Sequence, residues 1–363
     1  MLTILCALTF VSLTGAQSPT PQDELIRRVS QGRHIQAREL AHRLIREAAA
    51  PGSGAGIPYR AALYELLGTT ETALENYGEA QQALEHGLKL CEQHQAALPE
   101  LQVSLLVSLA ETHSVRANVA EANRILQRAL AVATSGLPPD HPRLASVLDG
   151  LGLLYAARGE ISRAEQFVRR ALAILERRLG PTHPDAAIEA LTLASLLLTA
   201  NRHTEAVPLI ERSRNVLERT YGRSHPRTVF AGYNLGIAQL KSNPAGAETA
   251  LRTTLADWRE SQPERHTITA RFLNALAAAR QEQGDIAEAL NLNNHALDIL
   301  RDVVGPEHPV VVTAMYDRAR LLLLGKRKKD AAALRKDADR IRLAKGDPEP
   351  GQHSIDIQAL RAR

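Results

Sequence analysis

The stretch that decides the fold is HPRLASVLDGLGLLYAARGEISRAEQFVRRALAILERRLGPT, residues 141–182. Its apolar side chains recur at three- and four-residue steps in two separate runs, which is the spacing of one face of an α-helix. The first run ends at Gly159. The second begins near Ile161 and stops at Gly180-Pro181, a glycine-then-proline signal typical of a helix end. The stretch therefore predicts two helices joined by a tight turn.

A histidine-proline pair opens this stretch and returns along the chain. The pairs begin at His141, His183, His225 and His308, at intervals of 42, 42 and 83 residues, and His266 divides the longest interval into 41 and 42. A fixed period of this length is typical of a solenoid, in which each helix pair buries its apolar face against its neighbours. We predict that the histidine, or the residue before it, begins the first helix of each pair. The proline then occupies the first turn, where its fixed φ is favourable.

Small residues recur at one position of each helix. Two helices can cross closely only where both side chains are small, because larger ones push the axes beyond about 8–10 Å. The small positions therefore predict where the two helices of a pair touch. They are Gly68, Ala110, Gly152, Ala194, Gly236, Ala277 and Ala319 in the first helix, and Ala80, Ala122, Ala164, Ala206, Ala247, Ala289 and Ala331 in the second.

This pattern carries a family resemblance over residues 57–349. It resembles the tetratricopeptide repeat of leucine-glycine, tyrosine and spaced alanines, here Leu151-Gly152, Tyr155, Gly159, Ala164 and Ala171. That repeat usually spans about 34 residues, so the longer unit, with its Leu179–Pro184 junction, resembles the kinesin-light-chain-like subclass. HEAT-like and armadillo repeats, at about 40–47 residues, also fit the period, but their small-residue patterns differ. The resemblance implies an all-α, right-handed superhelical solenoid of antiparallel helix pairs.

Composition agrees with an all-helical chain. Aromatic residues make up only 3% of the 363 residues, and the β-branched residues form no alternating runs of the kind that strands need. The predicted divisions are a signal peptide at 1–16, a partial N-terminal repeat or cap with a linker at 17–56, seven repeats at 57–97, 98–140, 141–182, 183–224, 225–265, 266–307 and 308–349, and a C-terminal capping tail at 350–363.

The first 16 residues form a different kind of segment. An apolar run is followed by Thr14-Gly15-Ala16, whose small residues suit signal-peptidase cleavage before Gln17, although the usual basic start is absent. We therefore expect export to the periplasm or beyond, with a disordered apolar start or a misassigned start codon as the alternatives. Removing this segment leaves Cys91 as the one cysteine of the mature chain, which can then form no internal disulfide.

The charge pattern gives little evidence of nucleic-acid binding. The net charge of +4 is small for this length, and the dense basic cluster, Lys326 to Lys329, falls at a turn without neighbouring aromatic residues. We expect no nucleic-acid partner and read the cluster as a solvated turn. An acidic partner or an anionic membrane surface is the alternative. We expect no stable membrane insertion of the mature protein and a monomeric state.

No catalytic motif is present in the sequence. It lacks H-E-x-x-H, G-x-S-x-G, a cysteine pair for a metal and the phosphate-binding G-x-x-x-x-G-K. The histidines occur once per repeat, and stacked helix pairs place successive copies about 10 Å apart, which is too far for one ion to bridge. We predict a protein without catalytic residues, metal or cofactor.

The resemblance implies that the first helix of each pair lines a concave groove. Groove positions are mostly small or polar in repeats one to three, and become aromatic, amide and basic from repeat five. Aromatic residues and arginine often anchor interfaces. The alternative is that these residues are solvated or pack between repeats. The predicted partner-binding residues are Phe230, Tyr233, Arg271, Asn274, Tyr316 and Arg320.

The resemblance implies a specific role for Asn274. It lies in Leu273-Asn274-Ala275-Leu276-Ala277, similar to the family helix whose asparagine hydrogen-bonds the backbone of a bound peptide. Only one repeat keeps this asparagine, which is a departure from the family pattern.

Two classes of function follow from the sequence. The first is a non-enzymatic interaction scaffold that presents its groove to a protein or an extended peptide. The second is a non-catalytic regulatory or structural subunit of an envelope or enzyme assembly, held through its convex or terminal surfaces.

Overall fold

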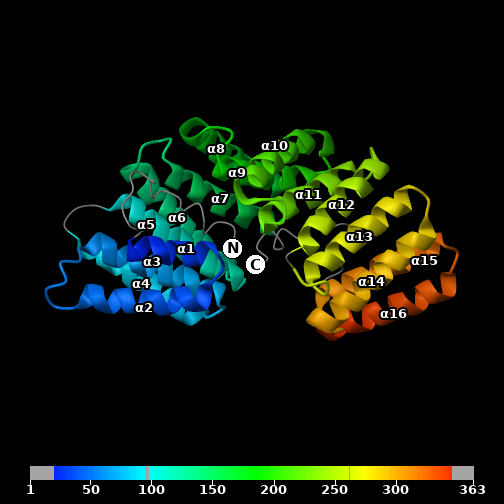
Figure 1. Cartoon of the computed structure of the whole chain (residues 1–363), viewed down its shortest axis with the longest axis horizontal. Helices are drawn as coiled ribbons and strands as arrows, with labels where there is room; N and C mark the ends of the chain where they lie inside the picture. The colour runs from blue at the N-terminus through cyan, green and yellow to red at the C-terminus, as the bar shows by residue number, and fades with distance from the viewer. Residues whose placement is uncertain (1–19, 95–97, 261, 346–363) are drawn as a thin grey trace. The chain divides into compact units, whose positions relative to one another are not determined.

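The computed structural model describes residues 20–94, 98–260 and 262–345, and the regular secondary structure in these ranges is entirely α-helical (Figure 1). The predicted all-α fold of antiparallel helix pairs is confirmed. The predicted signal peptide and C-terminal tail lie outside the described residues. The helices are α1 (Pro21–Ser30), α2 (His34–Ala49), α3 (Ile57–Ala73), α4 (Tyr77–Gln93), α5 (Pro99–Val115), α6 (Val119–Gly136), α7 (Pro142–Ala157), α8 (Ile161–Leu179), α9 (Pro184–Thr199), α10 (His203–Tyr221), α11 (Pro226–Gln239), α12 (Pro244–Arg259), α13 (Thr267–Glu282), α14 (Ile286–Val304), α15 (Pro309–Leu324) and α16 (Lys328–Lys345).

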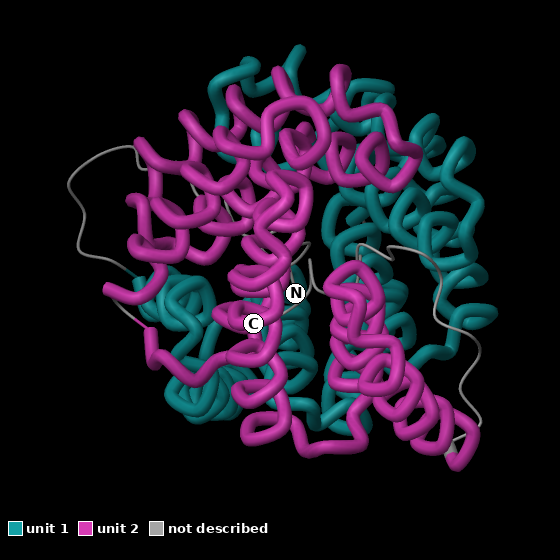
Figure 2. The backbone as a smooth tube through the Cα atoms, turned by 90° about the vertical axis from the view of Figure 1, so that its right-hand side faces the viewer, with its two compact units in different colours: residues 1–189, 356–363 teal, residues 190–355 magenta. Residues whose placement is uncertain are grey.

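The chain forms two compact units (Figure 2). The first unit ends at Glu189 and the second begins at Ala190, so the division falls inside α9. Helices α1 to α8 belong to the first unit, and α10 to α16 to the second. No described helix combines the length and the apolar character that a bilayer-spanning segment needs.

Histidines begin the first helices α7, α9, α11, α13 and α15, as the repeat predicts. His141, His225, His266 and His308 are the N-cap residues of α7, α11, α13 and α15. Each imidazole Nδ1 accepts a hydrogen bond from the backbone N–H two residues later, at 3.0–3.3 Å. The same bond, 3.2 Å long, joins His183 to the N–H of Asp185 at the start of α9. The histidine itself, and not the residue before it, is therefore the cap.

Small residues set the crossing of the two helices in a pair. A methyl group added at Gly152 of α7 would lie 2.6 Å from Cγ2 of Val168 and 3.3 Å from the carbonyl oxygen of Ala164, both on α8. Gly236 of α11 lies equally close to Leu251 of α12, 2.4 Å from its Cγ by the same measure. The predicted close approach is confirmed at these crossings.

The first helices of the pairs form the inner layer of each unit. Helix α5 contacts α3 and α7, and α11 contacts α13, in addition to the contacts that each makes with its pair partner. Helix α5 is consequently buried without interruption from Val103 to His113. The second helices are buried on one face, as in α8 with Ala164, Val168, Ala171, Leu172 and Leu175. The first helices are thus the ones that contact one another across successive pairs.

Candidate binding surface

The six predicted partner-binding residues all lie in the second unit. Phe230 and Tyr233 come from α11, Arg271 and Asn274 from α13, and Tyr316 and Arg320 from α15. Arg320 is exposed and the other five are half-buried. Their exposure to solvent is compatible with a binding role.

Tyr233 and Arg271 form the core of this surface. The guanidinium carbon of Arg271 lies 5.6 Å from the centroid of the Tyr233 ring, which is cation–π distance. The ring of Phe272 meets Tyr233 edge-on, with centroids 5.3 Å apart at 81°. Phe272 is only 1% exposed, so it anchors the Tyr233 ring to the hydrophobic core. Adjacent inner helices therefore present an ordered tyrosine ring and a guanidinium side by side.

Asn274 and Tyr316 each form a hydrogen bond to the second helix of their own pair. The Nδ2 of Asn293 on α14 donates to the Oδ1 of Asn274 at 3.0 Å, and Asn293 is buried. The Tyr316 hydroxyl donates to Asp339 at 2.6 Å and accepts from Arg342 Nε at 3.3 Å, both on α16. Burial, and then the bond to Asp339, raise the pKa of Tyr316. These two residues hold first and second helices together.

Arg320 and Phe230 flank the other residues. Arg320 forms an exposed ion pair with Asp317 at 3.7 Å, one turn earlier on α15, and such pairs contribute little to stability. Phe230 lies three residues before Tyr233, which places both on one side of α11. Of the six residues, the structure thus brings Tyr233 and Arg271 into contact and places Phe230 next to them along the helix.

Two acidic side chains are buried on first helices of the first unit, Glu65 on α3 and Glu189 on α9. Glu65 on α3 is 7% exposed and accepts a hydrogen bond from Ser104 on α5. Burial raises the pKa of Glu65, and burial together with Asp149 raises that of Glu189 well above its usual value. Within the first unit, Glu65 thus interacts with Ser104, and Glu189 with Asp149.

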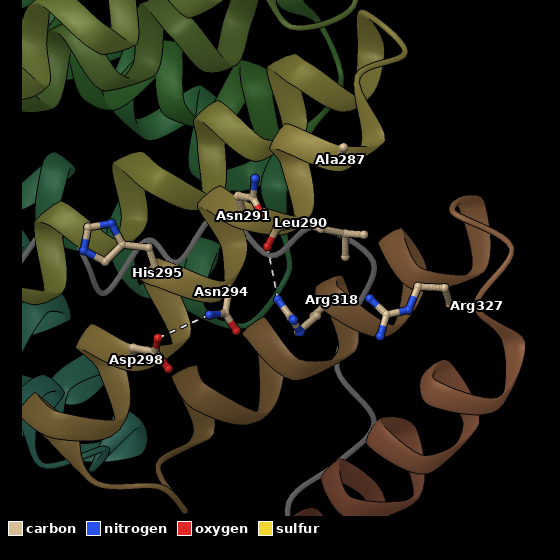
Figure 3. Close-up of a pocket in the computed structure, with 8 residues that line it drawn as sticks. All are labelled: Ala287, Leu290, Asn291, Asn294, His295, Asp298, Arg318 and Arg327. Carbon is tan, nitrogen blue, oxygen red and sulfur yellow. Dashed lines mark hydrogen bonds between the residues drawn. The ribbon is translucent and has the colours of Figure 1, made fainter.

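A pocket lies beside α14 and α15 (Figure 3). The sequence did not predict this pocket. Its volume is about 540 Å³. One sequence signal could have revealed it. Arg318 occupies the position that is leucine in the other six repeats, namely Leu67, Leu109, Leu151, Leu193, Leu235 and Leu276. The polar residues that line the pocket are Asn291, Asn294, His295, Asp298, Arg318 and Arg327.

The chain belongs to the tetratricopeptide repeat family. The sequence profile of this family, described as Tetratricopeptide repeat, matches residues 101–177, 185–260 and 268–342, which is over half of the chain. Each matched segment spans four helices, or two helix pairs. The family resemblance of the sequence is confirmed. No match is found among curated protein sequences.

Solved structures share the fold at low sequence identity. The apo form of RapI matches with a TM-score of 0.62 and 14% identity, over 89% of this chain and 86% of that one. A Rap protein complexed with competence and sporulation factor matches with a TM-score of 0.61 and 11% identity, over 78% and 76%. A putative kinesin light chain repeat protein of Podosopora anserina is 19% identical over 66% of this chain and 94% of that one, with a TM-score of 0.36. At these identities the likeness concerns the fold alone.

Proposed function

We propose that this protein is a non-enzymatic scaffold that binds a protein or an extended peptide along the inner face of α11, α13 and α15. The observation that carries the proposal is the contact between Tyr233 and Arg271, a half-buried pair on neighbouring inner helices. Tyrosine and arginine are over-represented among the residues that dominate binding energy at interfaces. The likeness to a Rap protein whose structure holds competence and sporulation factor supports a binding role for this arrangement of helices.

The pair is organised for binding before any partner arrives. Because Phe272 meets the Tyr233 ring edge-on and the Arg271 guanidinium lies 5.6 Å from the centroid of that ring, part of the freedom of the Tyr233 side chain is already restricted. Immobilising a flexible side chain on binding costs about 0.5–1.5 kcal/mol, so this order favours affinity.

The test is a double substitution, Tyr233→Ala with Arg271→Ala. We expect it to weaken capture of the partner from an extract of the native host by about 2 kcal/mol or more, as truncation of an interface anchor does. Because both residues are partly exposed, we expect the helical circular-dichroism signal to be retained and the melting temperature to fall only modestly, through the lost contact of Tyr233 with Phe272.

The single variant Arg340→Ala is the matched control. Arg340 also carries a guanidinium, but it is exposed on α16 and pairs with Asp337 in its own helix. Retained capture by a folded double mutant would contradict the groove proposal and favour the second class of function, a subunit held through its other surfaces. Loss of the helical signal together with lost capture would assign the pair to packing.

We further propose that the protein is exported and acts in the periplasm or outside the cell. The apolar start and the Thr14-Gly15-Ala16 site support this proposal. When this protein is isolated from its native host, its amino terminus should then be Gln17. An amino terminus at Met1 would contradict cleavage.

A further inference from the structure

The pocket beside α14 and α15 is made of one helix face and two arginines. Asn291, Asn294 and Asp298 follow one another along α14 at three- and four-residue steps, which aligns them on one side of the helix (Figure 3). Arg318 reaches the pocket from α15, and Arg327 from the turn between α15 and α16. None of these residues belongs to the surface around Tyr233 and Arg271.

Arg318 places a charged side chain at a position where the other six repeats have leucine. The six leucines at this position in the other repeats are all buried, with 8% exposure or less. Arg318 is half-buried, and its guanidinium donates to the carbonyl oxygen of Leu290 on α14 at 3.1 Å. Burial, and then the nearby charge of Arg327, lower the pKa of Arg318. A charged side chain thus stands where packing alone would select leucine, at a cost in desolvation.

The charge of the pocket is suited to an oxyanion. Two guanidiniums and the amides of Asn291 and Asn294 supply donors, and Asp298 is the acidic residue among those that line it. Asn294 donates to Asp298 at 3.3 Å, and Arg327 pairs with the exposed Asp330 at 2.7 Å. Lys326, Lys328 and Lys329 adjoin Arg327 in sequence. Guanidinium groups bind carboxylates with two parallel hydrogen bonds, which makes them selective for planar anions.

We infer that this pocket binds an acidic peptide segment, with a carboxylate on Arg318 and Arg327 and the peptide backbone against Asn291 and Asn294. A carboxamide carries both a donor and an acceptor, as a peptide group does, and the two asparagines lie one turn apart on an exposed helix face. The volume is within the range of about 300–1,000 Å³ found for ligand pockets. The site is a second binding site, independent of the inner face proposed above.

The test compares two fluorescent libraries of random octapeptides, one with a fixed central Glu-Ser-Glu and one with Gln-Ser-Gln. We expect the full-length protein to bind the acidic library at least tenfold more tightly. Arg318→Leu should remove most of this preference and keep the fold, because leucine occupies the same position in six repeats. Arg327→Gln, in an exposed turn, should also reduce the preference severalfold.

Arg340→Gln is the control for a general loss of positive charge, and should bind the acidic library within twofold of the parent. Equal binding of the two libraries would overturn the inference, as would an equal loss in Arg340→Gln. Vesicles containing phosphatidylserine form a further arm. Binding to them that depends on Arg318, without a preference for the acidic peptides, would overturn the peptide assignment in favour of a membrane surface.

Discussion

At the scale of single residues, the repeated histidine works as a hydrogen-bond acceptor. At the N-caps it occupies, its Nδ1 accepts a backbone N–H, which requires an unprotonated nitrogen there. Burial, and then the charge of Arg227, lower the pKa of His225 to about 4, and burial lowers that of His266. The cap is therefore coupled to pH, because protonation of Nδ1 removes the acceptor.

The sign of this coupling follows from the lowered pKa. An unfolded chain titrates histidine near pH 6.5, so the His225 cap contributes its full stability above about pH 6.5 and loses it as the pH falls toward 4. We expect His225→Asn, which caps without titrating, to reduce the loss of unfolding free energy between pH 7.5 and 4.5 by about 2 kcal/mol, allowing for partial solvent exposure. Urea unfolding at the two pH values measures this loss of free energy for the parent and for the variant.

His295→Asn is the control for this prediction, because His295 is exposed in the middle of α14 and not at a helix start. The change in stability with pH should then match that of the parent. If His225→Asn also matched the parent, the cap would contribute nothing to the pH dependence.

At the scale of helices, the tightest constraint is the crossing within a pair. Gly152 has no room for a methyl group beside Val168, whose β-branched side chain is stiff. Gly78, exposed near the start of α4, has no such neighbour within 4 Å. The two glycines are thus a matched pair of helical positions, one at a crossing and one in solvent.

We expect Gly152→Ala to lower the free energy of unfolding by roughly 1–3 kcal/mol, because overpacking forces α7 and α8 apart. Gly78→Ala should leave it unchanged or raise it by up to about 1 kcal/mol, since alanine favours the helix. Urea unfolding of both variants measures the two changes in free energy. Equal effects would mean that the crossing between α7 and α8 is not as tight as the structure has it.

At the scale of the whole molecule, stability comes from neighbouring helices. Helix α14 contacts its pair partner α13 more extensively than it contacts α15, the first helix of the next pair. In repeat proteins each unit depends mainly on its immediate neighbours. The damage from a deletion should therefore depend on whether it leaves a helix without its pair partner.

Two truncations test this dependence. A chain ending at Val304 loses the complete pair α15 and α16, and should keep a cooperative melt with a helical signal reduced in proportion to its length. A chain ending at Glu282 leaves α13 without α14, and should lose more helical signal than the deleted residues account for. Proportional loss in both would contradict the pairwise account of stability.

The sequence by itself determined the helix pairs, the places where their first helices begin, and their crossings. These features repeat with the period, and each depends on residues close together in the chain or at matched places in one unit. Gly152 could be assigned in this way, because a small residue is needed wherever two helices touch. At the helix starts the sequence left the histidine and the residue before it as alternatives, and the structure selected the histidine.

Only the tertiary structure decided what the groove side chains do. The sequence grouped Tyr233, Arg271, Asn274 and Tyr316, but the structure pairs the first two and turns the polar atoms of Asn274 and Tyr316 toward α14 and α16. It also placed Arg318 in a pocket with Asn291 and Asn294. The physical reason is that a repeat period fixes where a helix position lies, whereas the partner of a polar side chain depends on its rotamer and on residues far away in sequence.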